Sequence, residues 1–136
     1  MSATITAQAN KYVVYGDVVN SFQADPFTGD LLLVYNDQCV KQSIINIVRT
    51  MFYSRPYQPS VGSSIYSSLF DPADLFATTR AQNTIKEAIE NYEKRAHIQS
   101  VNATIIEPQG MSVTVIFYTM TSSVAQSVTI SVNRVR

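Results

Sequence analysis

The stretch HIQSVNATII, residues 97–106, decides the fold, because the spacing of apolar residues changes there from about 3.6 to two. Two further stretches of strand-forming residues follow, MSVTVIFYTM (111–120) and QSVTISVNRV (126–135), after turns at EPQG (107–110) and TSSVA (121–125). Alternation in the first stretch separates Ile98, Ser100, Asn102, Thr104 and Ile106 from Gln99, Val101, Ala103 and Ile105. The pattern predicts a C-terminal, three-stranded antiparallel β-meander.

Two main helices are predicted before these strands. The first has a cap at Asn36 or Asp37 and continues until Pro56 stops it. Its apolar stripe consists of Val40, Ile44, Ile47, Val48 and Met51. The second starts at DPAD (71–74), with Asp71 as the cap, and reaches Arg95. Its stripe consists of Ala81, Ile85, Ala88, Ile89 and Tyr92, and Glu90 is expected to pair with Lys94.

The remaining segments complete an α+β fold. After a turn at PFTGD (26–30), the apolar run LLLVY (31–35) predicts a buried N-terminal strand. A short helix capped by Ser63 or Ser64 is expected to reach Phe70. The predicted order is an N-terminal strand, two main helices plus one short helix, and the β-meander, all in a single domain of residues 1–136. Residues 1–10, MSATITAQAN, are predicted to form a flexible arm.

Composition points to protein partners. Ten Lys and Arg balance ten Asp and Glu, which disfavours nucleic acid or an anionic membrane as partner. Only 15% of residues are charged, while eight Tyr and six Phe suit protein interfaces. The sequence lacks a signal peptide and a membrane-spanning run, so we expect the chain to stay in the cytoplasm. Cys39 is expected to be packed and inert, although its place at a helix start leaves a lowered thiol pKa as an alternative.

Enzymatic motifs are scarce. One Cys and one His form no metal cluster, and no phosphate-binding loop is present, so no cofactor is predicted. Glycoside hydrolysis is the one alternative function, because it needs only two carboxyl groups. The candidate acids are Asp71, Asp74, Glu87, Glu90 and Glu93. Helix capping and a solvated face account for them, so no catalytic residue is predicted.

A segment between the helices, SRPYQPSVGSSIYSSLF (54–70), combines two prolines with aromatic and other apolar residues. Such a segment is typical of a stiff surface loop that another protein contacts. We therefore expect a surface for protein partners at Arg55, Pro56, Tyr57, Pro59 and Gly62, with Gly62 replaceable without loss of the fold.

Residues 17–106 resemble the small baseplate wedge proteins of contractile phage tails, and are similar to the wedge component of type VI secretion baseplates. The resemblance is carried by the turn DPFTGD, the helix start VKQSI, the loop RPYQPSVG and the segment SLFDP, and it resumes at IENYEKR. It implies a structural protein, not an enzyme, although some members have been labelled lysozyme-like.

The same resemblance implies a place and partners. The chain would lie in the tail baseplate of a virion assembled in the host cytoplasm. It would link the helical core bundle of the wedge to the tail tube and initiate the contractile sheath. Its partners would be other wedge proteins, tube or hub proteins and the sheath protein, with no nucleic acid and no membrane.

Glu93 and Arg95 match a Glu-Pro-Arg motif that, in the family, is thought to grip the core bundle, although Lys94 replaces the proline. Residues i and i+2 of a helix point about 200° apart, so the helix must end before Glu93 if the two charges act together. The alternative is an ordinary helix end, at which Lys94 and Arg95 complement the dipole. None of these three side chains is assigned to the core.

Overall fold

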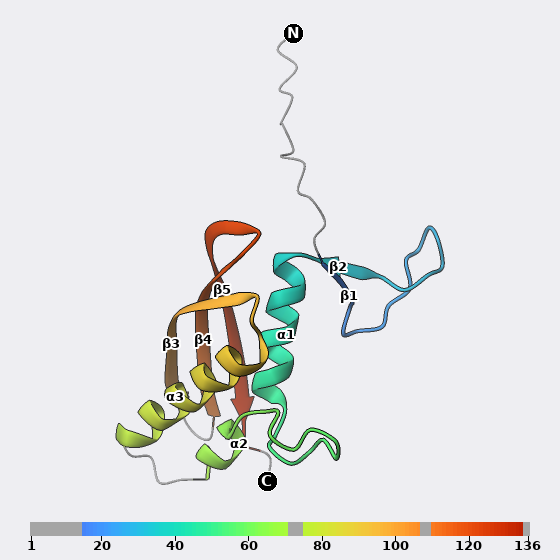
Figure 1. Ribbon diagram of the computed structural model, residues 1–136. Coiled ribbons are helices and arrows are strands. Elements are labelled where there is room, and N and C mark those ends of the chain that lie inside the picture. The colour runs from blue at the N-terminus through green and yellow to red at the C-terminus, as the bar shows by residue number, and fades with distance from the viewer. Residues whose placement is uncertain (1–14, 71–74, 107–109, 135–136) are drawn as a thin grey trace.

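The computed structural model describes residues 15–70, 75–106 and 110–134. The elements are β1 (Gly16–Val18), β2 (Leu33–Tyr35), α1 (Asp37–Arg49), α2 (Ile65–Ser68), α3 (Leu75–Tyr92), β3 (Ala96–Ile106), β4 (Gly110–Thr119) and β5 (Ser122–Asn133). Strands β3, β4 and β5 form an antiparallel sheet in that order, and α1 and α3 lie on one of its faces (Figure 1). The predicted α+β fold and C-terminal meander are confirmed, with one more N-terminal strand than expected. The helices within the described ranges are too short or too polar to span a membrane.

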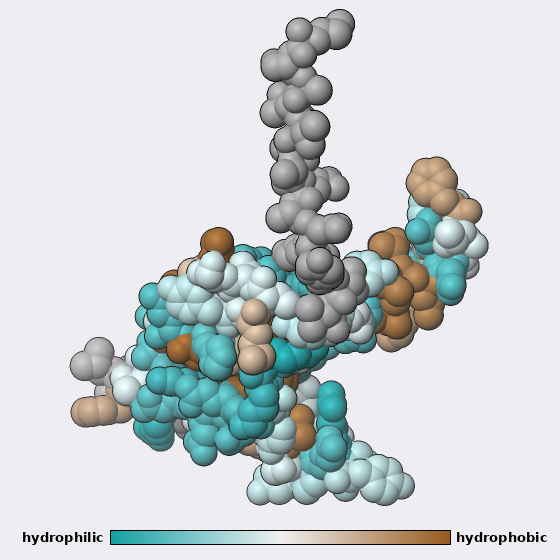
Figure 2. Space-filling model, turned by 45° about the horizontal axis from the view of Figure 1, so that its top comes forward, coloured by the Kyte–Doolittle hydropathy of each residue, from teal (hydrophilic) through white to brown (hydrophobic). Residues whose placement is uncertain are grey.

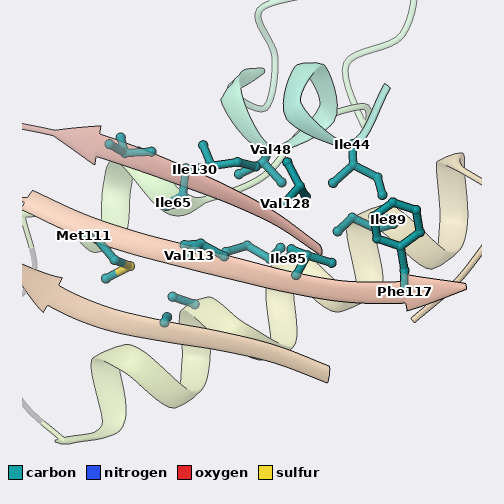
Figure 3. Close-up of a cluster of buried hydrophobic side chains, with 14 of the residues drawn as sticks. Ile44, Val48, Ile65, Ile85, Ile89, Met111, Val113, Phe117, Val128 and Ile130 are labelled. Atoms are coloured by element: carbon teal, nitrogen blue, oxygen red, sulfur yellow. The ribbon is translucent and has the colours of Figure 1, made fainter. Parts of the chain in front are cut away.

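The core lies between the two helices and the sheet (Figure 3). The central strand β4 alternates, so that Met111, Val113, Val115 and Phe117 point toward the helices. Each fully buried side chain of this size contributes about 1.5–3 kcal/mol to the free energy of unfolding. The helix residues that meet them are Val40, Ile44 and Val48 from α1, and Ala81, Ile85 and Ile89 from α3. This part of the core follows the predicted stripes.

Strand β3 departs from simple alternation. Its pairing with β4 shifts between Ile98 and Ser100, which marks a β-bulge around Gln99. A bulge adds one residue to one strand and so moves the following side chains to the opposite face. Ile98 and Val101 consequently pack against the same core, although the alternation predicted them on different faces. The predicted division of the strand into two faces is therefore wrong.

The turn between β4 and β5 is tighter than predicted, because β5 already begins at Ser122 and the TSSVA turn is largely strand. Hydroxyl groups at this turn bind the start of α1: Thr119 and Thr121 donate to Oδ1 of Asp37 at 2.6 and 2.9 Å. Asp37 is buried. The predicted cap is thus a tertiary link between α1 and the sheet, and Asn36, at the N-cap position, makes no side-chain capping bond.

Helix α1 ends at Arg49, well before Pro56, so the predicted stop is wrong. Thr50 is extended, and the chain returns at Ser63, whose amide donates to the Thr50 carbonyl at 2.9 Å. The buried Ser63 hydroxyl also donates to the Val48 carbonyl at 2.6 Å. Ser63 therefore donates hydrogen bonds to carbonyl groups at the C-terminal end of α1, and it does not cap α2. Since the helix is over, Met51 is exposed and outside the predicted stripe.

Helices α2 and α3 both end earlier than predicted. Helix α2 ends at Ser68, before the predicted Phe70, and Ser64 at its N-cap position makes no side-chain capping bond. The DPAD cap of α3 lies outside the described residues, as do residues 1–10. Helix α3 ends at Tyr92, which is partly exposed. Its Glu90 carboxylate lies 3.9 Å from Lys86, while Lys94 donates to the Glu90 carbonyl instead of the predicted carboxylate.

The N-terminal strand is part of an exposed hairpin. Strand β1, which the sequence did not predict, pairs with β2 in a two-stranded antiparallel sheet that projects from the body (Figure 1). Leu31, Leu33 and Tyr35 remain exposed because no second layer of the described chain covers them. The expectation of a buried strand is therefore wrong, while the PFTGD turn is confirmed, with Gly29 at φ 73°.

Cys39 is 1% exposed, and its Sγ lies 2.9 Å from the Val34 carbonyl. Burial, with the charge of Asp17, raises the pKa of the thiol. The prediction of a packed cysteine is confirmed, and the alternative of a lowered pKa is wrong.

Candidate protein interface

Glu93 and Arg95 form an ion pair immediately after α3. Arg95 Nε donates to Glu93 Oε1 at 2.6 Å and Nη2 donates to Oε2 at 2.7 Å, while the Arg95 amide approaches Oε1 at 3.3 Å. The helix ends at Tyr92, so the condition for the two charges to share one side is met. This geometry rules out two independent charges at a helix end and matches the bidentate fork in which guanidinium binds carboxylate.

The two partners differ in exposure. The Glu93 side chain is 4% exposed and that of Arg95 is 37% exposed. Burial raises the pKa of the Glu93 carboxyl, but hydrogen bonds from Arg95 and Ser43 and the charge of Arg95 outweigh it, and the net pKa lies below its ordinary value. Glu93 is therefore a buried, ionised group. The prediction that the Glu93 side chain lies outside the core is therefore wrong.

Tyr15 completes this group. The Arg95 Cζ lies 5.0 Å from the centroid of the Tyr15 ring, within the range of a cation–π contact. The Tyr15 hydroxyl is buried and has no hydrogen-bond partner within the described chain. The sequence predictions missed both Tyr15 and Ser43, because Tyr15 directly precedes β1, Ser43 lies in α1, and no local pattern connects them to Arg95.

The guanidinium retains donors for a partner. Of its five N–H groups, two are directed at Glu93, and one face of the plane is next to Tyr15. Arg95 is consequently held in one orientation, with its remaining donors available to acceptors outside the described residues. The side chain of Lys94 instead bonds to the carbonyl of its own helix.

The loop after α1 contains the second predicted group. Arg55, Pro56, Tyr57 and Pro59 are all exposed, with Tyr57 98% exposed. Gly62 differs, because it is buried at φ 138° and an added Cβ would lie 2.6 Å from the Thr50 carbonyl oxygen. A side chain at position 62 would strain the backbone and force the Thr50 carbonyl or the loop to shift, which speaks against the expectation that Gly62 can be replaced freely.

A hollow of about 390 Å³ lies beside the loop. Arg55 and Gln58 line it from the loop, Ser43 and Asn46 from α1, and Tyr92 from the end of α3. Ser43 also bonds to Glu93. The loop therefore lines the same surface depression as Ser43 and Tyr92, which neighbour the ion pair, while Glu93 and Arg95 are not among the lining residues.

The described candidate acids, Glu87, Glu90 and Glu93, do not form a catalytic pair. Asp71 and Asp74 lie outside the described residues, while Glu87 and Glu90 are exposed on α3. A general acid of a glycosidase needs a raised pKa, whereas the pKa of Glu93 is lowered and both of its oxygens bind Arg95. Within residues 15–70, 75–106 and 110–134, no three acids, Cys or His gather as metal ligands would.

The described chain is thus a small α+β domain whose exposed loop and ion pair, buried at Glu93 and partly exposed at Arg95, offer a surface to another protein. Residues 35–129 match the family model described as "Baseplate wedge protein gp25", so the chain belongs to this family of contractile-tail baseplate proteins. The chain is 27% identical over 94 residues to the baseplate wedge protein gp25 of Enterobacteria phage T4, covering 69% of this chain and 70% of that protein. It is thus a structural subunit of a contractile-tail baseplate.

Solved structures share the fold. The crystal structure of a proposed tail lysozyme from Geobacter sulfurreducens superimposes with a TM-score of 0.69 at 19% identity, over 77% of this chain and 96% of that one. A chain in the baseplate of the anti-feeding prophage gives 0.62 at 18% identity, over 86% and 83%. A chain in the postcontracted baseplate of pyocin R2 gives 0.52 at 17% identity, over 82% and 97%. At these identities the likeness concerns the fold alone.

Proposed function

We propose that this subunit links the helical core bundle of the wedge to the tail tube region and initiates sheath assembly, without catalysing a reaction. The observation that carries the proposal is the orientation of Arg95, which Glu93 holds by two hydrogen bonds and Tyr15 covers on one face. A guanidinium held in this way loses little side-chain entropy when it binds.

The acceptors that suit Arg95 are found at helix ends and on acidic side chains. The last carbonyl groups of a helix lack partners within the helix and carry partial negative charge. A helical bundle therefore presents acceptors for the free N–H groups of Arg95. The neighbouring hollow, with Arg55 at its rim, offers room for side chains of the same partner.

Sheath initiation is supported by the edges of the sheet. Strands β3 and β5 are the outer strands, and each has one edge that pairs with no strand among the described residues. The strand residues 96–106, 110–119 and 122–133 include no Lys, Arg, Asp or Glu. Charged residues normally protect such edges from another strand, so their absence from these strands favours the addition of a strand from a sheath subunit.

The test is the affinity of the purified chain for the wedge complex. Arg95→Ala should weaken it more than tenfold, because the acceptors of the partner would be left buried and unpaired, and about 1.4 kcal/mol corresponds to tenfold. Lys94→Ala is the matched control and should change the affinity little. Equal, small effects at both positions would contradict the role of Arg95.

A further inference from the structure

The β1–β2 hairpin, defined here as residues 16–35, exposes more apolar surface than its size explains. Leu31, Leu33 and Tyr35 recur at every second position and line one face, each between 45% and 47% exposed. Phe22 is 73% exposed, and Phe27 at the turn is 96% exposed. Hydrophobic residues consequently gather along the projection in Figure 2. Single exposed apolar residues are ordinary, but a continuous stripe on a projection marks an interaction surface.

Hydrogen bonds from α1 fix the orientation of the hairpin relative to the body. Gln42 of α1 accepts from the Asn20 amide at 3.0 Å and donates to the Val18 carbonyl at 2.7 Å. The side-chain amides of Asn46 and Asn20 bond to each other at 2.8 and 3.2 Å. An isolated two-stranded hairpin is marginally stable in water, so these bonds keep an otherwise weak element in place. Its apolar stripe is therefore preorganised for binding.

The charges of the hairpin restrict its partner. Between residues 16 and 35 the sequence contains Asp17, Asp25 and Asp30 but no Lys or Arg. Each carboxylate accepts a hydrogen bond from a nearby backbone amide, which leaves its negative charge in place. The hairpin of a second copy would bring like charges together, and an anionic bilayer would also repel them. A basic protein surface complements them.

We propose that the hairpin inserts into an apolar groove on a neighbouring baseplate protein, with Lys or Arg residues of that protein beside the Asp25–Asp30 turn. The apolar stripe and the Asp25–Asp30 turn are not among the residues that contact Arg95 or line the hollow, although Asp17 at the base of the hairpin lines that hollow. This proposal shares with the proposed function the location in a baseplate. The family match begins at residue 35, so all of the hairpin except Tyr35 lies before the matched region.

The test uses the full chain in assembled particles and a maleimide probe. Phe27→Cys provides a reactive thiol at the turn, and the native Cys39 is buried. The fold of the turn is retained, because Asp25 accepts from the backbone amide of residue 27 and not from its side chain. We expect labelling to be at least tenfold slower in particles than in the isolated chain. Equal rates would overturn the proposal.

A photo-crosslinking amino acid in place of Phe27 identifies what covers the turn. The expected product joins the hairpin to another baseplate protein, at a peptide with apolar residues next to Lys or Arg. A product joining two copies of this chain, or a peptide without basic residues, would overturn the proposal.

The charge is tested by the double change Asp25→Asn and Asp30→Asn, which keeps the side-chain oxygens that accept the turn hydrogen bonds. Incorporation into particles should fall several-fold, and the remaining incorporation should depend less on salt than that of the parent. Unchanged incorporation would overturn the proposal that Lys or Arg residues of the partner lie beside the turn. Arg95→Ala tests a different group of residues. If the cysteine at position 27 were protected in particles while Arg95→Ala had no effect on affinity, the proposed function would be contradicted and the proposal for the hairpin would stand.

Discussion

At Glu93, the carboxylate is buried and ionised at once, which makes its contribution to stability depend on pH. The Arg95 and Ser43 hydrogen bonds hold its folded pKa below the ordinary value of 4.5. Stability from this group is therefore fully present above about pH 4.5 and is lost as the pH falls through the folded pKa.

Glu93→Gln should consequently reduce the free energy of unfolding at pH 7 by about 1–2 kcal/mol. A larger loss is not expected, because Arg95 is partly exposed and solvent screens its charge. The difference from the parent should shrink below pH 4.5, because a protonated Glu resembles Gln. Urea unfolding at several pH values measures it. Glu90→Gln is the exposed control, and a difference that did not change with pH would contradict the ionised state of Glu93.

Two glycines with positive φ provide a second comparison at the residue scale. Gly29 lies at φ 73° with open space around it, whereas Gly62 lies at φ 138° against the Thr50 carbonyl. Gly29→Ala should cost about 1 kcal/mol for the left-handed backbone alone. Gly62→Ala should cost about 2 kcal/mol or more, because strain and a backbone clash combine. Thermal unfolding compares them, and equal costs would mean that the loop has room to shift.

At the scale of elements, the base of the hairpin depends on one side chain of α1. Gln42→Ala removes both bonds from the Gln42 amide group, to Asn20 and Val18, while the buried stripe of α1 stays intact. We expect the Asn20 amide to exchange its hydrogen at least severalfold faster, with little change in the melting temperature. Amide hydrogen exchange measures this. Unchanged exchange at Asn20 would show that strand pairing alone holds the hairpin.

At the scale of the whole molecule, the proposed role is geometric and predicts no turnover. The purified chain should not reduce the turbidity of a peptidoglycan suspension, because Glu87 and Glu90 are solvated and Glu93 is occupied by Arg95. The parent and Glu93→Gln should therefore behave alike in this assay. Reproducible lysis by the parent that Glu93→Gln abolished would favour the hydrolase alternative.

Periodicity was sufficient to predict the elements of the body. The two main helices and the central strand β4 each bury a face whose spacing can be counted within the element, as for Val40, Ile44 and Val48 in α1. In β3 the bulge around Gln99 interrupts this count. The motif residues Glu93 and Arg95 and the exposed loop from Arg55 to Pro59 were also visible in the sequence, through the resemblance or through composition.

Tertiary contacts decided the rest. The run LLLVY is apolar, but whether it is buried depends on a second layer, and the described fold places none over it. Asp37 meets Thr119, Gly62 meets Thr50, and Arg95 meets Tyr15, in each case through chain segments that no local spacing relates. The sequence by itself determined the main helices and strands of the body, because those preferences are local, whereas β1 and the start of β5 appear only in the structure. Only the tertiary structure determined which polar groups are buried and which apolar stripe remains exposed, because both depend on residues that folding brings together.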